Sequence, residues 1–189
     1  AKFAREKLGL SKVAILHNNA DDYAKGLTGI FKATFEKLGG TVVAVEAYGG
    51  ADIKDFNPQL VKIKAAQPEA IYLPNQFPEV ALQAQQARKM DITVPLLGSD
   101  SWDAPDLVKL AGDAIEGSYI TALFSKDSPD PKVAAFVKRF QQKYNDAPNS
   151  NATAAYDATK MLLQAIEKAG KLDAKAVRDA LATQSFEGS

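Results

Sequence analysis

Up to residue 123, short continuous apolar runs alternate with longer segments whose apolar residues lie three or four positions apart. A continuous apolar run of this length is typical of a strand that is buried on both faces of a parallel sheet. The sequence therefore predicts strands at residues 12–17, 41–48, 70–73, 94–97 and 118–123.

The segments between these runs have helical spacing. They predict helices at about 22–38, 57–66, 77–90 and 104–110. In the first of them, Asp21 or Asp22 is placed to cap the helix and Gly39 to end it. Strands that alternate with helices at this spacing predict an α/β fold with a doubly wound, mainly parallel five-stranded sheet, because each crossover helix covers one face of the sheet.

The pattern changes after residue 123. A Pro-rich joint at 126–131 is followed by three amphipathic helical stripes, within 133–144, 155–169 and 176–181, and Asp173 is placed to cap the last. The chain is therefore divided into an α/β ligand-binding lobe at 1–123 and a helical segment at 124–189.

Composition and charge narrow the classes of function. The 189 residues are 46% hydrophobic and 24% charged, as in ordinary globular proteins. Positive and negative side chains balance at 23 each, which disfavours nucleic acid and anionic membrane as partners. The chain has no cysteine and one histidine, His17, so thiolate and multi-histidine metal sites are excluded. No metal ion or cofactor is expected.

Signatures of catalysis are missing from the sequence. There is no phosphate-binding G-x-x-x-x-G-K-[ST] loop, no G-x-G-x-x-G after the first strand, and no G-x-S-x-G nucleophile motif. His17 precedes every candidate nucleophile and belongs to no recognisable motif. The sequence therefore predicts no catalytic residues and favours a binding protein over an enzyme.

Candidate ligand-binding residues follow three of the predicted strands. In an open α/β sheet, ligands bind just beyond the carboxyl ends of the parallel strands. The residues at these positions are Tyr23, Gln76, Phe77, Asp100 and Trp102. Asp100 is the candidate partner for a cationic group on a small ligand. Trp102, the only tryptophan, is expected on an exposed loop, where a large aromatic side chain usually has a binding role.

A structural role is the alternative for each candidate. Tyr23 and Phe77 are equally explained as core residues in the first turn of a helix. Asp100 is also placed to cap the short helix that follows it, although Asp103 is better placed to do so.

Several segments, in this order, resemble the branched-chain amino-acid-type solute-binding proteins of ABC importers, the type I periplasmic binding proteins. The matching segments are Lys12-Val13-Ala14-Ile15, Asp22-Tyr23-Ala24-Lys25-Gly26-Leu27, Asp55-Phe56, Gly98-Ser99-Asp100-Ser101-Trp102, Ala114-Ile115-Glu116-Gly117, Ala155-Tyr156-Asp157-Ala158, Ala165-Ile166-Glu167-Lys168-Ala169-Gly170 and Phe186-Glu187-Gly188. Their order is more specific than any one of them.

The resemblance implies a substrate-binding component, located in the periplasm or anchored outside the cytoplasm, that binds an amino acid between two lobes and delivers it to a membrane permease. Asp100 aligns with the acidic residue that pairs with the α-ammonium group of the ligand. Tyr23 aligns with a wall of the cleft, and Gln76 and Phe77 with a further contact. The alternative is a regulatory or receptor domain of the same fold that senses a small molecule.

Members of that family are much longer, and their first lobe would precede residue 1. The resemblance therefore implies a fragment, centred on the second lobe, without a leader. The stripes after residue 130 are expected either to fold back on the sheet or to pack against a second copy of the chain, as a homodimer through residues 131–182. Ligand binding by the fragment alone is expected to be weak or absent, because closure needs both lobes.

Overall fold

The computed structural model describes residues 1–50 and 52–188. Contacts between residues divide the chain into two compact units, Ala1–Thr121 and Ala122–Ser189. The first unit contains all the strands of the described chain and the second contains helices and loops.

The first unit is built on a parallel sheet of five strands in the order β2-β1-β3-β4-β5. The strands are β1 (Lys12–Asn18), β2 (Thr41–Tyr48), β3 (Ala70–Leu73), β4 (Leu96–Gly98) and β5 (Tyr119–Ile120). The α/β fold predicted from the sequence is confirmed. Strand β4 begins at Leu96, later than predicted. Strand β5 has only two residues, and both are exposed. The predicted strand at 118–123 is therefore mostly wrong, because the chain leaves the sheet edge after Ile120.

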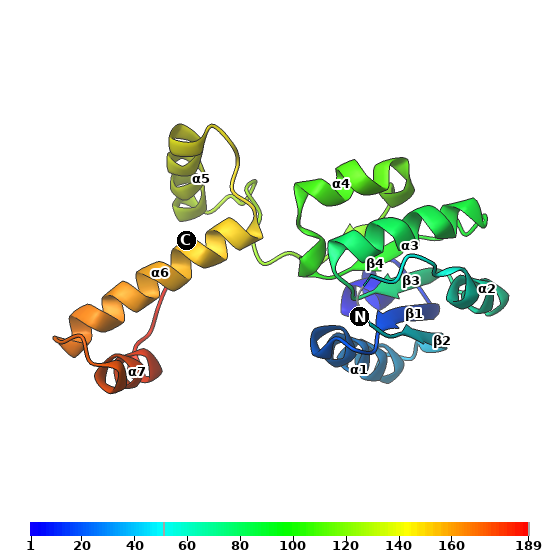
Figure 1. The fold of residues 1–189 in the computed structure, drawn as a ribbon, viewed down its shortest axis with the longest axis horizontal. Helices are drawn as coiled ribbons and strands as arrows, with labels where there is room; N and C mark the ends of the chain where they lie inside the picture. Colours follow the sequence, from blue (N-terminus) through cyan, green and yellow to red (C-terminus); the bar gives the residue numbers. More distant parts are fainter. Residues whose placement is uncertain (51, 189) are drawn as a thin grey trace. The chain divides into compact units, whose positions relative to one another are not determined.

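In the described residues of the first unit, four α-helices flank the sheet (Figure 1), and there are also shorter helical turns. The α-helices are α1 (Asp22–Lys37), α2 (Asn57–Ala65), α3 (Phe77–Lys89) and α4 (Pro105–Ala111), and the short turns are η1 (Phe3–Lys7), η2 (Asp100–Trp102) and η3 (Gly112–Ile115). Helix α1 lies on one side of the strands, and α2 and α3 lie on the other. The doubly wound arrangement follows from this division.

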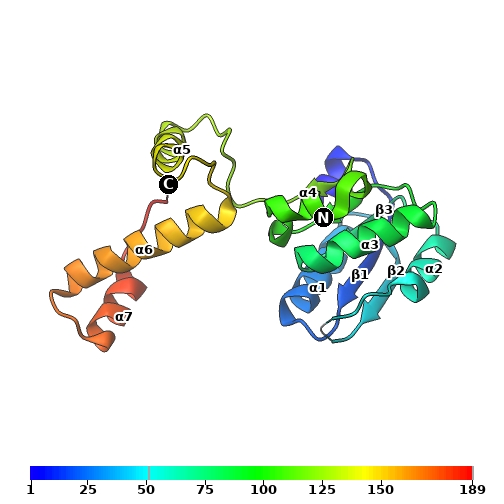
Figure 2. The ribbon, with the colours of Figure 1, turned by 45° about the horizontal axis from the view of Figure 1, so that its top comes forward.

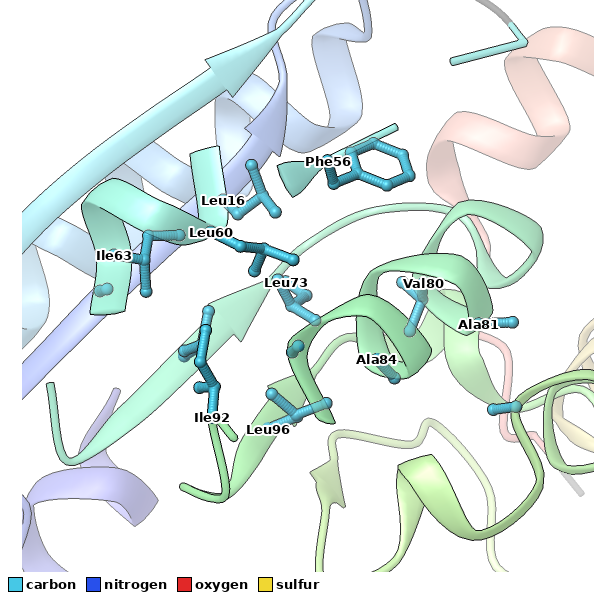
Figure 3. Packing of buried hydrophobic residues seen from close by; sticks show 14 of the residues in the cluster. Leu16, Phe56, Leu60, Ile63, Leu73, Val80, Ala81, Ala84, Ile92 and Leu96 are labelled. Atoms are coloured by element: carbon cyan, nitrogen blue, oxygen red, sulfur yellow. The ribbon is translucent and has the colours of Figure 1, made fainter. Parts of the chain in front are cut away.

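Two hydrophobic clusters form because successive residues of a strand point to opposite faces of the sheet. Val13 and Ile15 of β1 belong to the cluster under α1, whereas Ala14 and Leu16 belong to the larger cluster under α2, α3 and α4. Figure 3 shows the larger cluster, in which Leu16 and residues of β3 and β4 meet the apolar sides of α2 and α3. A strand with apolar residues on both faces thus supplies both cores, which explains the continuous apolar runs.

The described part of the second unit contains three helices, each with a side chain that caps its first turn. They are α5 (Pro131–Tyr144), α6 (Ser150–Ala169) and α7 (Ala174–Thr183). Asp130 accepts a hydrogen bond from the Lys132 N–H, Asn149 from the Ala152 N–H, and Asp173 from the Ala176 N–H. The predicted cap at Asp173 is confirmed. Helices α6 and α7 pack against each other (Figure 2).

Candidate ligand-binding site

All five strands run in the same direction, so their carboxyl ends meet at one edge of the sheet. The chain moves outward from β1 to β2 and then returns past β1 to β3, so the connections diverge between β1 and β3. Such a point, where the strand order reverses, is where open α/β sheets bind ligands. Three loops bearing the predicted site residues leave the sheet there or beside it.

Tyr23 and Asp100 are brought into direct contact. The Tyr23 hydroxyl donates a hydrogen bond of 2.6 Å to Oδ1 of Asp100, although the two residues are 77 positions apart. Helix α1 holds Tyr23 in its first turn, where the Tyr23 N–H donates to the capping carboxylate of Asp21 at 2.9 Å. Asp100 begins the short turn η2, immediately after β4 and Ser99. The structure thus places the two residues side by side.

The charges around the Tyr23–Asp100 pair leave the Asp100 carboxylate able to bind a cationic group. Burial raises the pKa of Tyr23, and its hydrogen bond to Asp100 raises it further, so the phenol stays protonated and donates. No lysine, arginine or histidine forms an ion pair with Asp100 among the described residues. Tyr72 lies close by, and burial raises its pKa, as does the nearby carboxylate of Asp100.

The prediction that Trp102 is exposed is wrong. Its side chain is 2% exposed and belongs to the larger hydrophobic cluster. The indole N–H donates to the Leu73 carbonyl at 3.1 Å, and the ring packs where a Cβ on Gly98 would overlap it. Trp102 therefore anchors η2 to the larger hydrophobic cluster. Its assignment as a ligand contact rested on the expectation that it is exposed, and its burial removes that support.

Gln76 and Phe77 begin α3 and have different surroundings. Phe77 is half-buried and packs against the larger hydrophobic cluster, in keeping with the structural alternative for this residue. Gln76 is exposed and lines a cavity of about 330 Å³ beside the carboxyl ends of β1 and β3. Their roles in binding stay predictions.

Two further residues at this edge, Tyr48 and Glu79, were not singled out from the sequence. Glu79 lines the same cavity as Gln76 and accepts hydrogen bonds from the Tyr48 hydroxyl at 2.6 Å and the Asn18 side-chain amide at 3.3 Å. Burial, then the bond to Glu79, raises the pKa of Tyr48. The signal was available, because Tyr48 is the last residue of a predicted strand and Glu79 lies in the first turn of a predicted helix.

The described residues contain no group of three or more potential metal-ligating side chains. Within the same residues, no helix combines the length and apolarity needed to cross a membrane.

The class of this protein is given by the family model that matches the chain. The family model described as "Periplasmic binding protein" matches residues 1–189. The chain therefore belongs to the periplasmic binding protein family, whose members bind solutes, and the resemblance drawn from the sequence is confirmed.

Individual relatives make the comparison more specific. The leucine-, isoleucine-, valine-, threonine- and alanine-binding protein of Pseudomonas aeruginosa is 31% identical over 186 residues, which are 98% of this chain and 49% of that protein. The Leu/Ile/Val-binding protein BraC3 of Rhizobium johnstonii is 33% identical over 183 residues, covering 96% of this chain and 48% of that protein.

Two solved structures share the fold. The leucine-binding protein LivK of Thermotoga maritima has a TM-score of 0.90 and 33% identity, with 99% of this chain and 53% of that chain covered. The branched-chain amino acid transporter substrate-binding protein LivJ of Streptococcus pneumoniae, in complex with isoleucine, has a TM-score of 0.88 and 32% identity, with the same coverage of 99% and 53%. The chain thus spans about half the length of the curated relatives and solved structures that it matches.

Proposed function

We propose that this chain forms one ligand-binding lobe of the substrate-binding component of an ABC importer, and that its ligand is a branched-chain amino acid. The observation that carries the proposal is the Tyr23–Asp100 pair at the carboxyl edge of the sheet. It combines a carboxylate that has no cationic partner among the described side chains with a phenol that keeps it in place. The names of the relatives support the choice of ligand.

In the proposed complex, Asp100 accepts hydrogen bonds from the α-ammonium group of the amino acid. The Tyr23 hydroxyl occupies one Asp100 oxygen, and the other accepts from the ligand in this proposal. Tyr23 remains on the first oxygen and forms one wall of the site. In the proposed complete protein, the first lobe supplies the contacts to the ligand carboxylate. We place the complete protein outside the cytoplasm, acting with a membrane permease.

The test is leucine binding by the complete gene product, measured by isothermal titration calorimetry before and after Asp100→Asn. A hydrogen bond to a charged group contributes about 1.5–3 kcal/mol, which corresponds to a loss of affinity of roughly 10- to 150-fold. Asp106→Asn is the matched control, because it removes the same charge from an exposed position on α4, where Asp106 pairs with Lys109. It should leave the affinity unchanged.

The two parts of the proposal fail in different ways. Absence of binding of leucine, isoleucine and valine to the unmodified protein would contradict the proposed ligand. Binding that survives Asp100→Asn without loss would keep the ligand and refute the site.

A further inference from the structure

Asn75 lies at the carboxyl end of β3 and is completely buried. Its Oδ1 accepts a hydrogen bond from the Asn18 N–H at 2.9 Å, and its Nδ2 donates to the Leu16 carbonyl at 2.8 Å and to Oε1 of Gln83 at 3.0 Å. Both amide protons and the amide oxygen therefore have partners. A buried polar side chain with this number of specific partners fixes the geometry of the elements it joins.

The amide of Asn75 continues the connection between β1 and β3 beyond the point where their backbone pairing ends. The two strands are paired up to Ile15 and Tyr72, and Pro74, which has no N–H, cannot donate to β1. The side chain of Asn75 makes bonds to a carbonyl and an N–H of β1 in place of the missing backbone bonds. It thereby holds the end of β1, from which the loop to Tyr23 begins.

The backbone of the same residue holds the loop that carries Asp100. The Asn75 carbonyl accepts a hydrogen bond from the Ser101 hydroxyl at 2.7 Å. The neighbouring Trp102 donates to Leu73 at 3.1 Å, so η2 is attached to the end of β3 at two adjacent residues. Asn75 is also the residue immediately before Gln76.

We infer that Asn75 is a positioning residue for ligand binding. It sets the separation of Tyr23 and Asp100 by joining the loop after β1, through its side chain, to the loop after β4, through its carbonyl. This inference rests on the proposed function, because it assumes that the Tyr23–Asp100 pair receives the ligand. Asn75 itself contacts neither Tyr23 nor Asp100 in the hydrogen bonds of the described chain.

A purely structural role for Asn75 is the competing explanation, and Glu69 provides the control for it. Glu69 joins the same two strands at their amino ends, where its Oε2 accepts from the backbone N–H groups of Ser11 and Lys12 at 2.5 and 3.0 Å. It lies at the opposite edge of the sheet from the candidate site. Loss of Glu69 weakens the same strand pair without disturbing the loops that carry Tyr23 and Asp100.

The experiment compares Asn75→Ala, Asn75→Asp and Glu69→Ala in the complete gene product. Leucine affinity is measured by calorimetry well below the unfolding midpoint of every variant, and Tm is measured by circular dichroism. Asn75→Ala is expected to weaken leucine binding at least tenfold. Asn75→Asp keeps the acceptor for the Asn18 N–H but turns an acceptor toward the Leu16 carbonyl and Oε1 of Gln83, so it is also expected to weaken leucine binding. Glu69→Ala is expected to lower Tm and to change affinity less than twofold.

A wild-type affinity in a folded Asn75→Ala or Asn75→Asp protein would overturn the inference. So would a loss of affinity in Glu69→Ala as large as in the Asn75 variants. If the Asn75 variants do not fold, Ser101→Ala decides the question, because Ser101 is half-buried and its hydroxyl makes the other half of the connection.

A second measurement needs no ligand and separates this inference from the proposed function. Tyr23→Phe, which removes the hydroxyl bonded to Asp100, is introduced into the unmodified protein, into Asn75→Asp and into Glu69→Ala. If Asn75 positions the pair, Tyr23→Phe lowers Tm less in the Asn75→Asp background than in the unmodified protein, because the bond is already weakened there. Equal shifts in all three backgrounds would refute the positioning role even if the protein binds no amino acid.

Discussion

The two units of this chain bury their apolar residues to very different extents. In the first unit, both faces of the sheet are covered, and Leu16, Phe35 and Ile71 are completely buried. In the second unit, the buried hydrophobic residues of the described chain are Phe136, Ala165 and Ala180. A sheet flanked by helices forms a core within its own unit. The three helices of the second unit each have one apolar stripe, and these stripes bury little of each other.

The contacts within the second unit show how limited that pairing is. The ring of Phe136 on α5 lies 4.8 Å from the ring of Tyr156 on α6, centroid to centroid. In contrast, Leu163 is 56% exposed and Leu172 is 88% exposed. Two buried alanines contribute little to stability, because each removes only a small apolar area from water. The second unit is therefore expected to depend on another surface for its stability.

The largest difference between the units is expected for Trp102→Ala. Removing a buried aromatic ring costs about 3–5 kcal/mol, and the hydrogen bond to the Leu73 carbonyl is lost as well. Leu172→Ala, in the second unit, is expected to change the free energy of unfolding by less than about 0.5 kcal/mol, because an exposed side chain loses little when it is shortened. Urea unfolding followed by far-ultraviolet circular dichroism measures both. Similar losses for the two variants would show that the units do not differ in the way described.

A smaller effect is expected on self-association, which tests what covers the stripes of the second unit. We expect residues 1–189, expressed alone, to form a homodimer through the helices at 131–182, since Leu163 and Leu172 are exposed there. Leu163→Lys should shift the mass measured by light scattering after size-exclusion chromatography from two chains to one. The control is Val61→Lys, at a 55% exposed position on α2 in the first unit, and it should leave the mass unchanged. A monomeric unmodified chain would contradict this expectation.

The smallest difference is expected for the helix caps. Asp21→Ala and Asp173→Ala each remove a side-chain acceptor from the first turn of a helix, and each is expected to cost about 1 kcal/mol. The effects should differ in extent. Asp21→Ala should lower the free energy of the cooperative unfolding of the sheet unit, whereas Asp173→Ala should increase hydrogen exchange in α7 only. Hydrogen exchange followed by mass spectrometry distinguishes these outcomes. Uniform changes in exchange across both units would indicate that they unfold together.

Much of the first unit could be predicted from local pattern. The helix from Asp22 to Lys37 and the strand from Thr41 to Tyr48 lie where the periodicity placed them, because the period of apolar residues records how many faces of an element are buried. The edge strand β5 could not be predicted in this way. Tyr119 and Ile120 have the composition of a buried strand, but both are exposed at the edge of the sheet.

The candidate site was predictable only in part. Asp100 and Tyr23 follow strands and so were expected at one edge of the sheet, but their contact depends on the strand order. The burial of Trp102 depends on the space above Gly98 and on a carbonyl of β3, neither of which is visible in the sequence around it. The residues around Trp102 are equally typical of an exposed loop and of a buried turn.

By itself, the sequence determined the alternation of strands and helices, the helix caps and which residues follow the strands, because these depend on neighbours within a few positions. Only the tertiary structure decided that Asn75 joins β1 to β3, that Ser101 binds the Asn75 carbonyl, and that Tyr23 meets Asp100. Each of these contacts joins residues that are at least 26 positions apart. Hydrogen bonds of this kind form only when a particular strand order brings the groups within bonding distance, and local sequence patterns do not specify that order.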